Sequence, residues 1–398
     1  MVKRNRQMKS VSGLQSDLRI GVLGAGGRGL LASQAHRPGA GSRIVACCDI
    51  APAILDQCHE QYGRDIVTST KYEDVLASGL DAVFICTPDW LHEEQALAAL
   101  KRGIGVYLEK PMAITITGCD RILRSARDNK ARLFVGHNMR YMNIIRKMKR
   151  LVDDGAIGRV KSIWCRHFVS YGGDAYFLDW HADRRRTTGL LLQKGAHDLD
   201  VIHWLAGAYT QRVSAFGSLA VYGDLPRRKS PALDQQKVGE DRWPPRTLSG
   251  FNPVMDVEDQ NVVIMQLPDG VLATYQQCHF TPDSCRNYTV IGDAGRLENV
   301  GDGPNDPIFL WNRRHDGFRL VGDEVYRGDP IDASLGHGGS DGVIVNEFLE
   351  FVRNGDSTMA TPEAARMSVA TGYQATLSLR NGGMPMDIPP IEWTENIR

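Results

Sequence analysis

Short apolar runs alternate with stretches of helical periodicity over the first third of the chain. The apolar runs lie at residues 18–23, 42–50, 81–87, 103–111 and 131–138. Between them, apolar positions recur at the spacing of helices that pack on one face. Strands that are apolar throughout belong to parallel sheets covered on both faces. The pattern therefore predicts a doubly wound α/β domain, a Rossmann fold, over residues 17–140.

The pattern changes after residue 140, where strand-like runs follow one another with short turns. A helix is expected at 142–158, and runs that suit strands occupy residues 159–170, 211–223, 260–280 and 286–300. Consecutive strands joined by turns favour an antiparallel sheet. We therefore expect a second, C-terminal α/β domain over residues 141–398, built on a largely antiparallel sheet.

Two segments stand outside this pattern. Residues 1–16 hold four basic residues and no acid. They have no continuous apolar run, so we expect a flexible basic leader, with an arm that embraces a neighbouring subunit as the alternative. Residues 223–256 are polar with little periodicity and predict an ordered insertion or a subunit contact.

Composition narrows the class of partner. The 398 residues include 47 Lys and Arg against 47 Asp and Glu, so no overall charge attracts nucleic acid or an anionic membrane. No apolar run reaches the roughly 18 residues that span a bilayer. The eight cysteines are scattered without a C-x-x-C pair, which is typical of reduced thiols in a cytoplasmic protein. No ligand spacing indicates a metal site, and His203 and His279 are interpreted as structural.

The turn after the first strand carries a phosphate-binding pattern. It fits G-x-G-x-x-G between a strand and a helix, where the first glycine allows a tight turn and the second lets the backbone approach a pyrophosphate. The third glycine lets the helix pack closely on the strand. The residues expected to contact the cofactor there are Gly24, Gly26, Gly27, Arg28 and Gly29.

Asp49 ends the second strand, 25 residues after Gly24. A carboxylate at this position accepts hydrogen bonds from ribose hydroxyls and repels a 2′-phosphate. No arginine follows it to pair with such a phosphate. The sequence therefore predicts NAD rather than NADP.

Polar residues follow a later strand of the same sheet and interrupt a later helix. Glu109 and Lys110 come directly after the strand, where ligands of parallel sheets bind. A partly desolvated lysine can exchange a substrate hydroxyl proton. In the predicted helix at 188–207, the apolar start is broken by Gln193, Lys194, His197, Asp198 and Asp200.

These motifs together resemble the glucose–fructose oxidoreductase and inositol dehydrogenase family, Gfo/Idh/MocA. The resemblance rests on GAGGRG, CCDI, ICTPDWLH, LEKP, GHNMRY and KGAHDLDVIHWLAG in this order. It implies an NAD-dependent enzyme for a sugar or polyol. It also implies that the open sheet of the second domain forms a subunit interface, so we expect a homodimer or homotetramer.

The resemblance also assigns residues. Lys110 and His197 match the family's catalytic pair. Asn138 and Arg140 match the edge of the substrate pocket. Apart from the resemblance, Asp200 lies three residues after His197 and would either hold its imidazole or cap local backbone groups. The further cofactor contacts expected are Thr87, Pro88, Trp90, His92, Glu109, Asn138 and Trp180. The substrate contacts expected are Tyr141, Arg166, His167, Gln193, Lys194, His197 and His337.

The chain departs from the family at one position. Relatives commonly carry an aspartate four residues before the catalytic histidine, where this chain has Gln193. Glutamine forms hydrogen bonds but exchanges no protons. Lys194 adds a positive charge, and with Arg166 it would suit an anionic sugar. Arg184–Arg186 either join such a basic pocket or pair with nearby aspartates.

Three functions compete at this stage. The favoured one is a redox-neutral oxidoreductive glycoside hydrolase that abstracts hydride from a pyranose carbon, C3, of an anionic glycoside such as a sulfoquinovoside or uronide. It differs from glycosidases that use two carboxylates. The alternative is a simple sugar or polyol dehydrogenase that releases NADH. A non-catalytic NAD-binding regulator fits the Lys110 and His197 pair least well.

Overall fold

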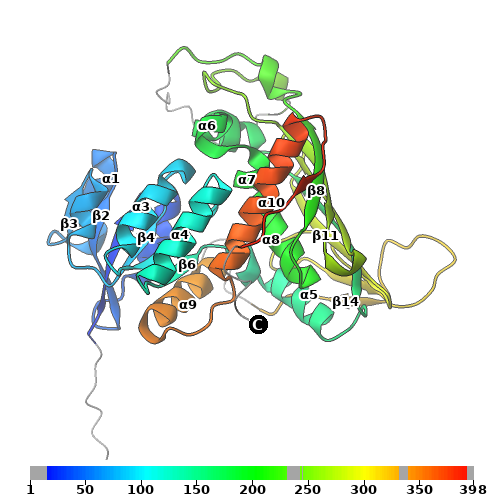
Figure 1. The fold of residues 1–398 in the computed structure, drawn as a ribbon, viewed down its shortest axis with the longest axis horizontal. Helices are drawn as coiled ribbons and strands as arrows, with labels where there is room; N and C mark the ends of the chain where they lie inside the picture. The colour runs from blue at the N-terminus through cyan, green and yellow to red at the C-terminus, as the bar shows by residue number, and fades with distance from the viewer. Residues whose placement is uncertain (1–15, 231–242, 244, 331–338, 392–398) are drawn as a thin grey trace, which may run out of the picture.

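Two sheets joined by helices make up the computed structural model, which describes residues 16–230, 243, 245–330 and 339–391. The expected leader lies almost wholly outside these residues, as does the centre of the 223–256 segment. Figure 1 shows the first sheet with its helices on one side, the second sheet on the other and helix α10 between them. No helix of the described part is long and apolar enough to cross a membrane.

The first sheet is parallel and has the strand order β3-β2-β1-β4-β5-β6. The strand order reverses its direction between β1 and β4. Doubly wound sheets bind ligands at this switch point. The strands are β1 (Leu18–Leu23), β2 (Ser42–Cys48), β3 (Val67–Ser69), β4 (Ala82–Ile85), β5 (Gly105–Leu108) and β6 (Leu133–Val135). The predicted doubly wound domain is confirmed.

Helices cover both faces of this sheet because its strands are apolar on both sides. One face packs against α2 (Tyr72–Leu76), α3 (His92–Leu100), α4 (Ile116–Asp128) and α10 (Pro362–Arg380). The other packs against the 3₁₀ segment η1 (Gly27–Ala35), α1 (Pro52–Tyr62) and α9 (Ser340–Asn354). Helices from the end of the chain therefore complete the first domain's core, which the predicted boundary at residue 140 does not anticipate.

The second sheet is largely antiparallel, as predicted, in the order β14-β13-β12-β11-β7-β10-β9-β8-β15. Only β7 and β10 run parallel among its paired strands in the described residues. The strands are β7 (Val160–Phe168), β8 (Arg212–Ser218), β9 (Gln260–Gln266), β10 (Leu272–Cys278), β11 (Cys285–Gly292), β12 (Arg296–Asn299), β13 (Ile308–Trp311), β14 (Glu324–Tyr326) and β15 (Met386–Asp387).

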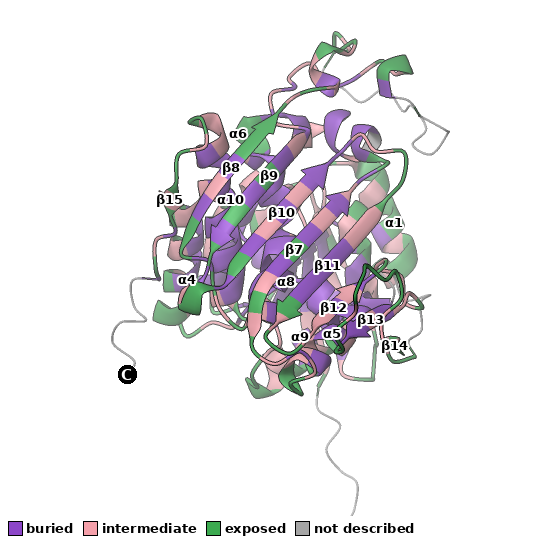
Figure 2. Ribbon diagram, turned by 90° about the vertical axis from the view of Figure 1, so that its right-hand side faces the viewer, coloured by how far each residue is buried: buried purple, intermediate pink, exposed green. Residues whose placement is uncertain are grey.

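One face of the second sheet packs against helices and the other is open. The inner face contacts α5 (Asn143–Asp153), α8 (Gly195–Ala206) and α10. Figure 2 looks onto the outer face, which the described helices leave uncovered. Side chains alternate between the two faces along each strand, so residues in β7 that are neighbours in sequence reach opposite environments.

The 223–256 segment contributes buried side chains where it is described. Phe251 and Met255 join an apolar cluster with Phe177 and Tyr222. The cluster supports the loop of residues 173–182, which borders the pocket described next. The prediction of an ordered insertion or a subunit contact stays open, and residues 231–242 and 244 lie outside the described residues.

Candidate functional site

The glycine-rich turn between β1 and η1 is closed by its own backbone. Gly24 has φ +75°, a conformation that L side chains rarely adopt. A Cβ on Gly29 would lie 1.9 Å from the Gly24 carbonyl oxygen, so only glycine permits this packing. Above Gly27 nothing lies within 4 Å of the position of a Cβ. The turn therefore leaves open space beside its backbone, which fits the pyrophosphate of a dinucleotide.

Asp49 lies beside this turn at the end of β2. Its Oδ2 accepts a hydrogen bond from the Gly26 N–H at 3.1 Å, and its Oδ1 accepts one from Ala51 at 3.0 Å. The carboxylate is only partly buried, so lone pairs remain for ribose hydroxyls. The residues present fit NAD, whose pyrophosphate Gly26 and Gly27 would hold and whose adenosine ribose Asp49 would hold.

Arg28 lines the pocket and is also held by two carboxylates. Its Nε donates to Glu109 Oε1 at 2.6 Å, and its Nη1 donates to Asp341 at 2.9 and 3.0 Å. Arg28 therefore ties the glycine turn to the end of β5 and to the first turn of α9. It lines the pocket, but its charge is already balanced by two carboxylates.

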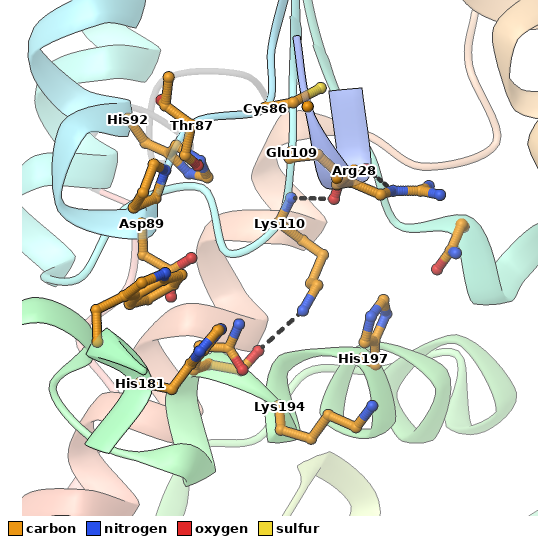
Figure 3. A pocket seen from close by; sticks show the side chains of 16 residues that line it. Arg28, Cys86, Thr87, Asp89, His92, Glu109, Lys110, His181, Lys194 and His197 are labelled. Carbon is orange, nitrogen blue, oxygen red and sulfur yellow. Dashed lines mark hydrogen bonds and ion pairs between the residues drawn. The ribbon is translucent and has the colours of Figure 1, made fainter. Parts of the chain in front are cut away.

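A pocket of about 470 Å³ continues from the glycine turn to the start of α8. Figure 3 shows its side chains, which come from both domains. The lining residues are Gly26, Gly27, Arg28, Cys86, Thr87, Pro88, Asp89, His92, Glu109, Lys110, Asn138, Trp180, His181, Gln193, Lys194 and His197. Most of the predicted site residues thus come together in one cavity.

Lys110 extends from the end of β5 into this pocket (Figure 3). Its Nζ donates to the main-chain oxygen of Gln193 at 3.2 Å, which joins the two domains. Burial, followed by the nearby charge of Lys194, lowers the pKa of Lys110 to about 8. A lysine with this pKa is partly neutral near physiological pH and can accept a proton.

His197 and Gln193 meet Lys110 from the other domain. The expected helix at 188–207 is broken into α7 (Leu190–Gln193) and α8, with Lys194 at the junction. Burial, and then the charge of Lys110, holds the pKa of His197 well below its usual value. The neutral His197 ring has no partner at Nδ1 among the described residues, and Gln193 Oε1 has none either. Both atoms are buried, and the two side chains line the pocket.

Lys194 brings a second ammonium group to the pocket. Its Nζ lies 5.8 Å from the ring centre of Tyr171 and 5.5 Å from that of Tyr176. Burial and the nearby Arg286 lower the pKa of Lys194. Within the described part of the chain no ion pair joins Lys194 to a carboxylate. Tyr171 and Asp198 raise the pKa of Lys194 in opposition. A partly buried cation without an ion-pair partner among the described residues can take an anionic ligand as its counter-ion.

His167 does not line the pocket, because it is held by Asp198 below α8. Its Nδ1 donates to Asp198 Oδ2 at 2.8 Å, and its Nε2 accepts from Arg286 Nη2 at 3.1 Å. Burial and Arg286 lower the pKa of His167 to about 3, so the ring is neutral. Asp198 also accepts from Tyr275 and Tyr288 at 2.8 and 2.6 Å. This network joins α8 to the sheet.

Arg166 points to the other side of the sheet, contrary to the prediction that it binds substrate. It donates to Asn287 at 3.0 Å and lies 5.0 Å from the ring centre of Trp164 on the outer face. The neighbouring His167 points inward, where β11 supplies Arg286 at the paired position. The alternation of side chains along β7 therefore separates Arg166 from the pocket. The basic site is left to Lys194.

Three further predicted residues lie away from the pocket. Tyr141 is fully buried in the first domain's core, with α9. Arg140 and Asp200 form a buried ion pair at 2.7 Å, so Asp200 does not hold the His197 imidazole. His337 lies outside the described residues.

The loop after β4 matches its predicted position. The His92 ring lies 2.8 Å from the Thr87 oxygen and 2.7 Å from the Pro111 oxygen, and so it connects the ends of β4 and β5. Trp90 packs edge-on against Trp180 with ring centres 5.1 Å apart. Trp180 lines the pocket and Trp90 supports it.

Arg184–Arg186 do not line the pocket. Arg184 pairs with Asp256 at 3.0 Å and Arg185 with Asp183 at 2.6 Å. The guanidinium of Arg186 lies over the Trp90 ring. Of the two interpretations of this segment, the structure supports pairing with nearby groups.

Three pocket residues, Cys86, Asp89 and His181, were not assigned to the site from the sequence. Asp89 is buried and follows Pro88, and the only signal was its place in the TPDWLH loop. Burial raises the pKa of Asp89 to about 7, although Lys110 opposes this. His181 stacks on Trp180 with ring centres 3.6 Å apart, and burial lowers its pKa to about 3. In the described chain no group of three or more His, Cys, Asp or Glu side chains is arranged for a metal ion.

Comparison with known proteins connects this site to one family. Residues 18–137 match the model of the NAD-binding Rossmann fold of the Gfo/Idh/MocA oxidoreductases, and residues 149–388 match the model of their C-terminal alpha/beta domain. The structure of GenD2 from gentamicin A biosynthesis in complex with NAD superimposes with a TM-score of 0.72 at 18% identity. The match covers 96% of this chain and 100% of GenD2, and it shows the shared fold.

Two curated relatives match over shorter stretches. Inositol 2-dehydrogenase of Burkholderia cenocepacia is 34% identical over 197 residues, which is 48% of this chain and 55% of the relative. The 2,7-anhydro-N-acetylneuraminate hydratase of Mediterraneibacter gnavus is 28% identical over 200 residues, or 49% of this chain and 51% of the relative. The chain thus spans about half the length of these two relatives.

Proposed function

Because the chain belongs to the Gfo/Idh/MocA family of NAD-binding oxidoreductases, we propose that it is a redox-neutral oxidoreductive glycoside hydrolase. Its substrate is a pyranoside that carries a carboxylate or sulfonate, such as a uronide or sulfoquinovoside. When bound, NAD⁺ supplies the ability to take a hydride from a sugar carbon, C3, and to return it. The chain's residues bind the sugar and handle the protons.

The observation that supports this proposal is the number of proton-exchanging groups in one pocket. Lys110, His197, His181 and Asp89 all line it. Oxidation of a single hydroxyl requires one base. Elimination of an aglycone and addition of water require further proton transfers, and the additional groups suit them.

Lys110 is assigned the first proton. Its Nζ is anchored by the Gln193 carbonyl, and its lowered pKa leaves a lone pair for the C3 hydroxyl. His197 lines the pocket with a neutral ring and would bind the same or a neighbouring hydroxyl. Once C3 is a ketone, the hydrogen on C2 becomes acidic, and its loss allows the C1–aglycone bond to break.

Lys194 supports an anionic substrate. It is the lysine of the pocket that lies against two tyrosine rings without a carboxylate partner among the described residues. A relative named 2,7-anhydro-N-acetylneuraminate hydratase supports a hydrolytic rather than a simple dehydrogenase activity.

Incubation with NAD⁺ and nitrophenyl glycosides of neutral, carboxylated and sulfonated sugars tests the proposal. We expect nitrophenol release that requires NAD⁺, prefers the anionic sugars and leaves no NADH after turnover. Nitrophenol release that continues after NAD is stripped would contradict any redox mechanism.

A simple sugar or polyol dehydrogenase is the second candidate. The Lys110 and His197 pair favours it, and a relative is named inositol 2-dehydrogenase. It predicts NADH formed in proportion to substrate, with no aglycone released. The same assay therefore separates the two functions.

We further propose that the enzyme is a homodimer or homotetramer assembled through the outer face of the second sheet. That face exposes Trp164, Val262, Ile264 and Leu272, each between 44% and 53% accessible in the isolated chain. Exposed apolar patches of this kind commonly mark protein contacts. A cytoplasmic location is proposed because all eight cysteines are free thiols.

A further inference from the structure

Asp89 is a buried carboxylate of the pocket that forms no ion pair with a cation of the described residues, although the charge of Lys110 lowers its pKa. It begins the 3₁₀ turn η2 (Asp89–Leu91), directly after Pro88, and is 4% exposed. Its only side-chain partner in the described chain is the Thr187 hydroxyl, which donates to Oδ2 at 3.4 Å. Figure 3 shows Asp89, Lys110 and His181 around the same space.

The other carboxylate of the pocket is already engaged. Glu109 accepts from Arg28 at 2.6 Å and from the Lys110 N–H at 3.0 Å. Glu109 is therefore fixed as a structural anion, whereas Asp89 keeps its lone pairs toward the cavity. A buried carboxylate without an ion-pair partner destabilises the fold. This cost favours a functional role for Asp89.

We infer that Asp89 is the base that removes the C2 proton of the oxidised sugar. This inference rests on the proposed function. Asp89 takes the proton, the C2–H electron pair becomes the C1=C2 bond, and the aglycone leaves with the C1–O electron pair and takes a proton from solvent. Water then adds its oxygen to C1 and releases one proton to solvent, which replaces the proton taken by the aglycone, while Asp89 returns its proton to C2. The C3 carbon takes back the hydride stored in the first step, and the C3 oxygen takes back the proton held by Lys110.

The remaining bases of the pocket suit this step less well. Lys110 has already accepted the C3 hydroxyl proton, so it is charged when the C2 proton must leave. His181, whose pKa is about 3, and His197, whose pKa also lies well below its usual value, are weak bases. Burial raises the pKa of Asp89 to about 7, so its carboxylate is more basic than an ordinary aspartate.

Exchange of the C2 hydrogen with solvent deuterium tests the assignment. The probe is the nitrophenyl glycoside that the NAD-dependent assay identifies, with exchange read by mass spectrometry. For Asp89→Asn we expect NADH formation in the first turnover to persist, with its pH limb moved to lower pH because Asp89 raises the pKa of Lys110. C2 exchange and aglycone release should fall by about 100-fold or more. Lys110→Met should lose all three.

Thr187→Val provides a second variant that keeps the carboxylate. The Thr187 hydrogen bond lowers the pKa of Asp89, so its removal should move the acid limb of C2 exchange to higher pH without changing first-turnover oxidation. Infrared difference spectra offer a readout without turnover. A carboxylic acid band that titrates near pH 7 should be present in the wild type and absent in Asp89→Asn.

The outcomes separate the inference from the function on which it rests. No C2 exchange in the wild type would overturn the proposed function and the inference with it. Wild-type exchange that survives in Asp89→Asn at the same rate would overturn the inference alone. Loss of both oxidation and exchange in a folded Asp89→Asn protein would also overturn it, because Asp89 would then be a positioning residue for Lys110.

Discussion

At the scale of single residues, burial sets the chemistry of Lys110. Its ammonium is removed from water and lies near a second ammonium, Lys194, so its neutral form becomes accessible near pH 8. Asp89 raises the pKa of Lys110 in opposition. The pKa of Lys110 therefore depends on the charges around the pocket. Removal of Lys194 should raise this pKa, and removal of the Asp89 charge should lower it.

The pH dependence of oxidation follows from this arrangement. Below pH 8 Lys110 is protonated and cannot accept the hydroxyl proton, so first-turnover NADH formation should rise with pH through about 8. In Lys194→Met the limb should move to higher pH, because the removed charge lowered the pKa of Lys110. Stopped-flow absorbance across a pH series measures both. An unchanged pH dependence in Lys194→Met would show that Lys194 does not lower the pKa of Lys110.

The same substitution tests anion recognition. Lys194→Met should raise KM for the carboxylated or sulfonated glycoside by about 10- to 100-fold, since a hydrogen bond to a charged group contributes about 1.5–3 kcal/mol. Arg166→Met is the matched control, because Arg166 lies on the opposite face of the sheet. Equal effects of the two variants would contradict a specific anion site at Lys194.

At the scale of elements, α8 serves the pocket and the sheet with consecutive residues. His197 faces the pocket, while Asp198 reaches down to Arg286, His167, Tyr275 and Tyr288. Burial alone would raise the pKa of Asp198, but Arg286 and His167 lower it below its usual value. The network therefore fixes the position of α8, which carries His197, relative to the sheet.

Asp198→Ala should destabilise the fold by about 3–5 kcal/mol, because it removes one partner of a buried ion pair. Urea unfolding measures this, with Asp153→Ala in the exposed pair with Lys149 as a control expected to cost less than about 1 kcal/mol. Since the pKa of Asp198 is lowered by folding, its contribution is present above pH about 4 and lost as pH falls below that. If Asp198→Ala lowers the free energy of unfolding no more than Asp153→Ala does, the Asp198 network contributes little to stability.

At the scale of the whole molecule, the two domains share one site and leave one sheet face open. The pocket needs Lys110 from the first domain and His197 from the second, and the Lys110–Gln193 hydrogen bond joins them. Helices α9 and α10 follow most of the second sheet in the sequence, but they pack on the first sheet. The domains are therefore coupled by packing as well as by the ligand.

The outer face of the second sheet is the proposed subunit interface, and substitutions on it test the assembly. Trp164→Lys combined with Ile264→Lys should convert the oligomer to monomers in analytical ultracentrifugation, because both side chains lie on the outer face. Val67→Lys, at the edge of the other sheet and 43% exposed, is the control and should leave the assembly unchanged. A wild-type protein that is monomeric, or a double variant that stays assembled, would contradict this interface.

The sequence by itself determined the fold class, the cofactor turn and most of the pocket. Buried strands and a glycine turn follow from local patterns, and parallel strands bring their carboxyl ends together, so Asp49 and Lys110 could be placed without coordinates. Gln193, Lys194 and His197 also line the pocket as the helix pattern predicted, although the helix itself is divided in two.

Only the tertiary structure decided which neighbours of these residues face the cavity. Arg166 and His167 differ by one position in β7, and the register with β11 sends one outward and ties the other to Asp198. Asp89 has no sequence pattern of its own. Its burial, and its lack of an ion-pair partner among the described residues, result from packing against segments distant in the chain. Local periodicity reports which face a residue takes, but the partner across that face is set by packing, and packing determines charge and proton affinity.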